Sequence, residues 1–205
     1  MMELFYPEKL FDLSKERKLF LATIYIHRLI SVYKMYLDEN NEDPNSWKRT
    51  ILGKYRDIEE ILIKDKFCIT ENIYKNVMCN KKEFNEIINK NINTEDEDAE
   101  EEQIVLNCIN AIDEYFDVIL EKDDIQARMY IMLHDCHQGM SYSSDYDGEA
   151  ENAEIEWQTQ ALDIVSNSKE EIPFNLIDNL NRKYNSNHKD WMQVEVFEGV
   201  QEYDI

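Results

Sequence analysis

Glycine and proline are scarce in this sequence. Only 4 glycines and 3 prolines occur among the 205 residues. Sandwiches and barrels use turns rich in these two residues to separate their short strands, so the scarcity argues against an all-β fold. Long helices joined by short polar loops need few such turns. The composition therefore favours an all-α fold.

Long apolar runs and paired cysteines are also lacking. No stretch approaches the roughly 18 uncharged apolar residues of a membrane-spanning helix, and the first residues lack the basic and apolar regions of a secretory signal. The four cysteines are scattered, without a Cys-x-x-Cys pair: Cys68, Cys79, Cys108 and Cys136. We expect reduced thiols, most of them packed as small hydrophobic residues. These features predict a cytoplasmic protein.

Motifs of catalysis are absent as well. The sequence contains no glycine-rich phosphate loop, no dinucleotide fingerprint and no Gly-x-Ser-x-Gly elbow. Carboxylates are so frequent that their spacing singles out no acid/base pair. Cys136 stands beside His137, but neighbouring side chains on a helix point apart and make a poor nucleophile and base. We predict that the protein is not an enzyme and has no catalytic residues.

A metal site is the remaining chemical function that the sequence could support. His134 and His137 share a helix face and could hold a metal together, whereas Cys136 is rotated roughly 200° from His134. A complete site would need a carboxylate from the following loop: Asp145, Asp147 or Glu149. No second His-x-x-Glu element supplies the other half of a four-helix metal site. We expect histidines at a helix end, no metal and no cofactor.

Helical periodicity dominates what is present. Apolar residues recur at intervals of three and four, and capping residues such as Ser14, Ser46 and Thr70 precede several of these stripes. The stripes predict helices at about 14–38, 46–62, 70–77, 84–88, 94–120, 123–136, 149–165 and 173–184. Residues 191–197 alternate and carry β-branched and aromatic side chains, which favours a short extended segment. We predict one domain over 1–205, a bundle of six to eight helices.

The histidine and arginine of the first helix, His27 and Arg28, interrupt an otherwise apolar stretch. Two interpretations of this pair remain open. The side chains could lie on a solvated edge of the helix, or they could be partners of ion pairs within the domain.

Charge is distributed very unevenly along the chain. Residues 1–92 carry 16 Lys and Arg against 15 Asp and Glu, a net charge of +1. Residues 93–205 carry the other 6 basic residues against 29 acidic ones, a net charge of −23. An acidic surface repels phosphate, so we expect neither nucleic acid nor an anionic membrane as a partner. A basic protein fits this charge better.

Three acidic clusters follow one another in the second half. They comprise Glu95 to Glu102; Asp145, Asp147, Glu149, Glu151, Glu154 and Glu156; and Glu195, Glu198, Glu202 and Asp204. Tyrosines near the second cluster add aromatic groups of the kind that anchor interfaces. The predicted partner-binding residues are Glu95, Asp96, Glu97, Asp98, Glu100, Glu101, Tyr142, Asp145, Tyr146, Asp147, Glu149 and Glu151. The alternative is that the charge only keeps the protein in solution.

Three segments of the chain resemble the YjaG-like helical family, a bacterial domain of unknown function. The segments are Ser14–Leu37, Glu101–Leu120 and Ile125–Val165. The resemblance rests on Phe20-Leu21-Ala22-Thr23, His27-Arg28-Leu29, Tyr33, Ala111-Ile112-Asp113, Met132-Leu133, Gln138-Gly139 and Glu154 to Gln160. It departs where the family has a Glu-Arg pair and a Pro-Asn-Tyr step, since here the chain has His27-Arg28 and Ser31-Val32-Tyr33. The resemblance implies an all-α fold and supplies no activity.

These features together indicate an inhibitory binding protein. Our hypothesis is a bacterial immunity protein or antitoxin that neutralises a basic toxin, with a nuclease as the favoured target, by covering its basic site. A non-catalytic helical adaptor or housekeeping protein would have the same composition, and a metal-dependent enzyme is a more distant alternative.

Overall fold

A computed structural model describes residues 8–92, 100–121 and 149–187, together with a few positions between 125 and 136. The described part holds one 3-10 turn and six α-helices, which confirms the predicted all-α bundle. The elements are η1 (Glu8–Leu10), α1 (Lys15–Glu39), α2 (Trp47–Lys64), α3 (Glu71–Asn91), α4 (Glu100–Leu120), α6 (Glu149–Asn167) and α7 (Phe174–Asn187). The extended segment predicted at 191–197 lies outside the described residues.

The predicted capping residues begin the first three helices. The Ser14, Ser46 and Thr70 hydroxyls accept hydrogen bonds from the backbone N–H groups of Arg17, Arg49 and Ile73, each at 3.3 Å. Each bond satisfies a backbone donor that has no partner within its own helix. The sequence therefore sets these three helix starts locally.

The two short helices expected at 70–77 and 84–88 form one continuous helix, α3. The residues between them include neither proline nor glycine, so nothing in the backbone ends the helix there. Ile73, Val77 and Phe84 lie buried on one face of α3, which packs on α2 and α4. Spacings of four and seven residues keep all three side chains on that face.

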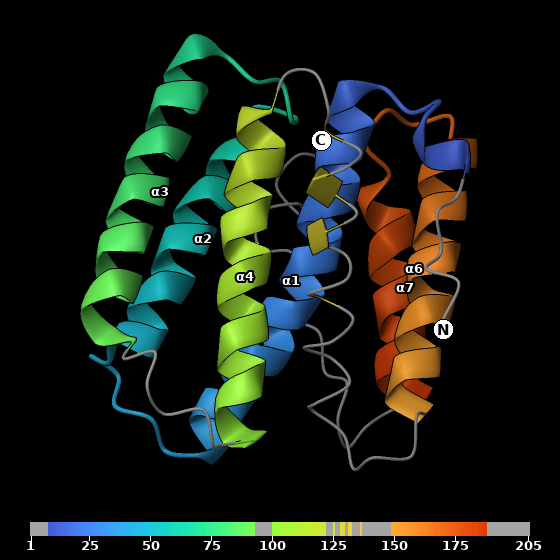
Figure 1. The fold of residues 1–205 in the computed structure, drawn as a ribbon. Helices are drawn as coiled ribbons and strands as arrows, with labels where there is room; N and C mark the ends of the chain where they lie inside the picture. Colours follow the sequence, from blue (N-terminus) through green and yellow to red (C-terminus); the bar gives the residue numbers. More distant parts are fainter. Residues whose placement is uncertain are drawn as a thin grey trace.

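Helix α1 passes through the middle of the molecule (Figure 1), with α2, α3 and α4 on one side and α6 and α7 on the other. Every residue from Lys18 to Tyr33 is buried, including polar ones that an amphipathic stripe would leave in water. A helix that is buried all round is characteristic of the interior of a bundle. Buried residues of all the described helices belong to one hydrophobic core.

The side-chain contacts of α1 fix the directions of its neighbours. Near the start of α1, the Lys15 Nζ lies 3.4 Å from the Glu121 carbonyl just after α4, and Arg17 Nη1 donates to the Val165 carbonyl late in α6 at 2.9 Å. Helices α4 and α6 therefore both run antiparallel to α1. In Figure 1 both begin at the end of the bundle where α1 finishes.

None of the described helices is both long and apolar enough to cross a membrane. Among the cysteines, Cys108 and Cys136 are buried, Cys68 and Cys79 are exposed, and all four are free thiols. Burial raises the pKa of the Cys108 thiol well above its ordinary value. A protonated thiol inside the core is a packing group rather than a nucleophile.

The central position of α1 predicts that two leucines contribute unequally to the free energy of unfolding. Leu29 on α1 is fully buried, whereas Leu176 on α7 is 42 % exposed. We expect Leu29→Ala to lower the free energy of unfolding by about 2–5 kcal/mol. The matched control Leu176→Ala is expected to stay within about 0.5 kcal/mol of the wild type. Urea unfolding followed by circular dichroism measures both, and equal losses would contradict the assignment of α1 as the central helix.

Candidate functional site

Most of the predicted partner-binding residues lie outside the described residues. These are Glu95, Asp96, Glu97, Asp98, Tyr142, Asp145, Tyr146 and Asp147. The structure describes the backbone at the other four, where Glu100 and Glu101 start α4 and Glu149 and Glu151 start α6. Glutamates in the first turn of a helix are favoured by the positive end of the helix dipole.

The two glutamate-rich starts lie at one end of the bundle. Since α4 and α6 both run antiparallel to α1, both begin beside its C-terminal end (Figure 1). We call the first-turn residues Glu100, Glu101, Glu149 and Glu151 the acidic end. Two stretches of sequence about 50 residues apart thus bring charge of one sign to the same end of the molecule.

Many of the basic side chains in the described residues already pair with carboxylates. Lys81 lies 3.1 Å from the Asp113 carboxylate and 2.7 Å from that of Asp117. Arg49 pairs with Asp38 at 2.7 Å, beside the start of α2. The whole chain has 44 acidic residues and 22 basic ones, so at least half of the carboxylates have no cation of their own. The surplus charge is therefore negative.

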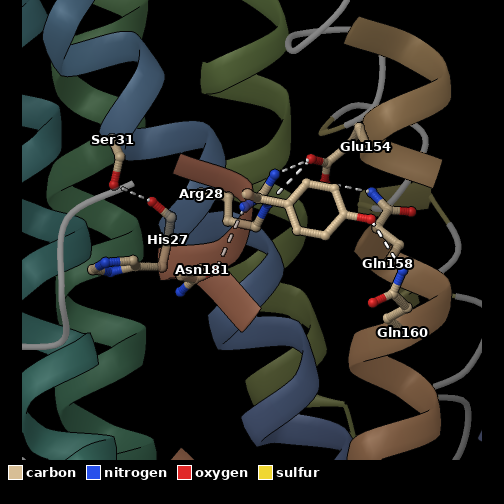
Figure 2. A network of polar contacts seen from close by, with 8 residues as sticks. His27, Arg28, Ser31, Glu154, Gln158, Gln160 and Asn181 are labelled. Atoms are coloured by element: carbon tan, nitrogen blue, oxygen red, sulfur yellow. Dashed lines mark hydrogen bonds and ion pairs between the residues drawn. The ribbon is translucent and has the colours of Figure 1, made fainter. Parts of the chain in front are cut away.

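A buried polar network joins α1 to α6 and α7 (Figure 2). Its centre is Arg28, whose side chain is fully buried. Arg28 Nε and Nη2 both donate to Glu154 Oε2, at 3.1 and 2.8 Å, and Nη1 lies 3.4 Å from Asn181 Oδ1. The Gln158 amide donates to the other oxygen of Glu154 at 3.0 Å. The buried carboxylate thus has a partner for each oxygen, as buried charges require.

Aromatic rings complete the surroundings of this guanidinium. Its central carbon lies 4.0 Å from the centroid of the Trp157 ring, and Tyr25 meets the same ring edge-on with centroids 5.7 Å apart. The Tyr25 hydroxyl donates to the Gln158 carbonyl at 3.0 Å. The ring face of tryptophan attracts the cation, so Trp157 is a core residue that also holds Arg28 in place.

His27 makes a second buried contact on the other side of α1. Its Nδ1 lies 2.7 Å from Glu59 Oε1 on α2, and the Tyr55 hydroxyl donates to the same oxygen. A carboxylate only accepts, so the proton of this contact is on Nδ1. Figure 2 shows the His27 and Arg28 side chains leaving α1 in different directions. Consecutive residues therefore reach carboxylates on two opposite flanks of α1.

Thr23 and Tyr115 add a third polar contact, between α1 and α4. The Thr23 hydroxyl donates to the Leu19 carbonyl at 2.8 Å, and its oxygen lies 2.7 Å from the Tyr115 hydroxyl. Because the threonine proton is already used, Tyr115 is the donor in this contact. Burial raises the pKa of the Tyr115 phenol, as it does for Tyr25 and Tyr55. Phenols kept neutral in this way serve as hydrogen-bond donors, which fits packing rather than acid/base chemistry.

These contacts revise two interpretations of the sequence. Of the two interpretations of His27 and Arg28, the solvated edge is wrong: Arg28 forms an ion pair with Glu154, and His27 contacts the Glu59 carboxylate within the domain. Glu154 belonged to the second acidic cluster, yet it is fully buried, while Glu156 two residues later is exposed. The helical spacing of Glu154 from the apolar residues Trp157 and Ala161 could have raised this possibility. The identity of its partner, 126 residues away, could not be read from a local pattern.

The described residues contain no group of three or more His, Cys, Asp and Glu side chains arranged to hold a metal. His134 and His137 lie outside this part of the chain, and Cys136 between them is buried.

Comparisons of the chain with models of protein families, with curated proteins and with solved structures give no match.

The His27 contact predicts unequal roles for two adjacent glutamates. Glu59 is buried and accepts two hydrogen bonds, whereas Glu60 is exposed. Glu59→Gln removes a charged acceptor, and we expect it to lower the free energy of unfolding by about 1.5–3 kcal/mol. The control Glu60→Gln is expected to change it by less than about 0.5 kcal/mol. Denaturant unfolding of the two variants measures the difference, and similar values would refute the buried contact.

The buried carboxyl of Asp178 on α7 leads us to predict that the stability of the fold depends on pH. It is buried, and its Oδ1 has no hydrogen-bond partner in the described part of the chain. Burial raises the pKa of this carboxyl above its ordinary value of 3.8, although Arg182 and His27 oppose the effect. Between the unfolded and the raised folded pKa the native state binds more protons, so this group lowers stability as the pH rises through that interval.

Replacing Asp178 by Asn should remove this dependence. We expect Asp178→Asn to stabilise the protein near neutral pH, and the gain to shrink as the pH falls toward about 4. Unfolding free energies of both proteins, measured across this range, test the prediction. A gain that is the same at every pH would show that the ionisation of Asp178 is not its cause.

Proposed function

We propose that this protein is an inhibitory binding protein, a bacterial immunity protein or antitoxin that neutralises a basic toxin, with a nuclease as the favoured target. One observation carries the proposal: the glutamate-rich starts of α4 and α6 lie at the same end of the bundle (Figure 1). A partner that contacts this end meets both stretches together. The cytoplasm is the proposed place of action, in keeping with the free state of all four cysteines.

The surplus of negative charge supports a basic partner. With 22 cations for 44 carboxylates, the protein must tolerate repulsion among the acidic groups. A partner rich in lysine and arginine would relieve that repulsion on binding. In a nuclease such residues hold the phosphates of the substrate, so a carboxylate surface placed over them would exclude nucleic acid.

Electrostatics would mainly set the rate of such an encounter. Complementary fields raise association rates to about 10⁸–10⁹ M⁻¹s⁻¹ at low salt, which suits a protein that must capture a toxin quickly. Affinity would depend on a few residues that become fully desolvated in the interface. Salt should therefore slow association more than it speeds dissociation.

The test compares two variants that remove the same amount of charge. One neutralises the acidic end, with Glu100→Gln, Glu101→Gln, Glu149→Gln and Glu151→Gln. The control neutralises four exposed glutamates elsewhere: Glu60→Gln, Glu71→Gln, Glu170→Gln and Glu171→Gln. The helix signal in circular dichroism first verifies that both variants are folded.

Each protein is tagged and expressed in the cells from which the sequence comes, and bound proteins are cross-linked and identified by mass spectrometry. We expect the wild type and the control variant to retain a basic protein, and the variant of the acidic end to bind it at least about tenfold more weakly. Association of the purified pair should slow as salt is raised. Equal binding by the two variants, or a partner without excess basic charge, would refute the proposal.

A second measurement separates inhibition from adaptor function. The recovered partner is expressed alone and together with the wild-type chain, and growth and nuclease activity are followed. An inhibitor should restore growth and suppress the activity. A partner that is harmless when expressed alone would point to the adaptor class instead.

A further inference from the structure

His27 of α1 and Glu59 of α2 are two ionisable side chains that face each other inside the bundle. His27 is 7 % exposed and Glu59 is 9 % exposed, and Nδ1 of the imidazole lies 2.7 Å from Oε1 of the carboxyl group. A buried carboxylate is costly unless a positive charge matches it. The number of protons on the imidazole therefore decides whether this contact is an ion pair.

The proton affinities of the two side chains favour the ion pair. An unperturbed histidine has a pKa of about 6.5 and an unperturbed glutamic acid one of about 4.3, so a shared proton prefers the imidazole about a hundredfold. Glu59 Oε1 accepts from His27 Nδ1 and from the Tyr55 hydroxyl, and two donors stabilise the ionised form of a carboxyl group. The Nδ1–Oε1 distance of 2.7 Å is that of a charge-assisted hydrogen bond.

A second carboxyl group acts on the imidazole from α7. Asp178 is buried, and it lies close enough for a positive charge on His27 to lower the pKa of its carboxyl, although burial raises that pKa overall. Arg182, one turn later on α7, acts on Asp178 in the same direction. A carboxylate beside an imidazole favours the protonated ring, so α7 adds to the effect of Glu59.

The other titratable groups near the contact supply no alternative cation for Glu59. Arg28, the next residue of α1, is matched by Glu154 of α6. The phenols of Tyr55 on α2 and Tyr115 on α4 stay neutral because burial raises their pKa values. No lysine or arginine of the described ranges pairs with Glu59, which leaves the imidazole to carry the matching charge.

We propose that His27 is an imidazolium in the folded protein at neutral pH, matched by Glu59 of α2 and assisted by Asp178 of α7, and that loss of its proton weakens the fold. The imidazole leaves α1 in a different direction from Arg28 (Figure 2), so these two buried cations are matched separately. The contact among α1, α2 and α7 is therefore sensitive to pH.

This proton makes the stability of the fold depend on pH. In the unfolded chain the imidazole loses it at about pH 6.5. Between that pH and the higher pH at which the folded protein releases the proton, the native state binds one proton more than the unfolded state. The ratio of folded to unfolded protein therefore falls by up to about tenfold for each pH unit within this interval. Below it both states are protonated, and the contribution of the ion pair is complete.

Nitrogen-15 NMR of the histidine side chains in the full chain observes the proton directly. The two ring nitrogens have similar shifts in an imidazolium and widely separated shifts in a neutral ring. The chain has four histidines, and through-bond correlations to the assigned backbone identify the ring of His27. We expect an imidazolium at neutral pH, with a titration midpoint at least about one pH unit above that of a free histidine.

Three substitutions test the source of the effect. Glu59→Gln keeps the shape of the side chain and removes the carboxylate, so it should lower the titration midpoint of His27 by at least about one pH unit. Asp178→Asn should lower the midpoint by a smaller amount. The matched control Glu60→Gln changes an exposed neighbour and should leave the midpoint unchanged.

Urea unfolding measures the consequence for stability. His27→Asn places an amide nitrogen near the position of Nδ1 and lacks the charge. Relative to this variant, the wild type should lose at least about fivefold in its folded-to-unfolded ratio between about pH 6 and 8. The comparison cancels groups that titrate alike in both proteins, such as the buried thiol of Cys108.

A neutral His27 ring at neutral pH would overturn the proposal, as would the same titration midpoint in Glu59→Gln and the wild type. Parallel pH profiles of the wild type and folded His27→Asn would also overturn it. If His27→Asn does not fold, the midpoints in the wild type, Glu59→Gln and Glu60→Gln decide the outcome by themselves. None of these measurements involves a partner, so the result is independent of the proposed inhibition.

Discussion

A fully buried guanidinium is the constraint around which this bundle is arranged. Arg28 cannot lose its proton inside a protein, so its charge must be matched wherever the chain places it. Glu154, Gln158, Asn181 and the face of Trp157 provide that match, and they come from two helices late in the sequence. The burial of the centre of α1 therefore depends on packing with segments that lie more than 100 residues away in the sequence.

The position of α1 makes this constraint act on both sides of the molecule. Arg28 faces α6 and α7, while His27, the residue before it, contacts Glu59 on α2. On each side of α1, a buried polar contact joins it to the helices packed there. Burying ions in this way adds little stability in general, and its best-attested benefit is a unique arrangement.

The small number of cations affects both the interior and the surface of the protein. Cations of the near-neutral first half are used within the described residues, in the core by Arg28 and at helix surfaces by Lys81 and Arg49. Even so, the whole chain has only 22 cations for 44 carboxylates. The excess of carboxylates is carried to the exterior, and the parallel direction of α4 and α6 brings a share of it to one end (Figure 1). The proposed recognition of a basic protein follows from this combination.

Several features could be predicted from the sequence because their causes are local. The all-α fold class follows from the apolar periodicity and from the scarcity of glycine and proline. The starts of three helices follow from the hydroxyls of Ser14, Ser46 and Thr70. The charge asymmetry is a property of composition alone. The division of residues 70–91 into two helices was wrong because a gap in an apolar stripe does not break a backbone that lacks a breaking residue.

Only the tertiary structure decided which helix is central, which carboxylate is buried and which helix starts share an end. Periodicity reports the face that a helix buries, but not the element that covers it, so Glu154 looked like one more surface acid. Its role depends on a contact with a residue 126 positions away. The sequence by itself determined the helices and the sign of the charge. The packing of distant segments determined where that charge is placed, because burial and pairing depend on neighbours in space and not on neighbours along the chain.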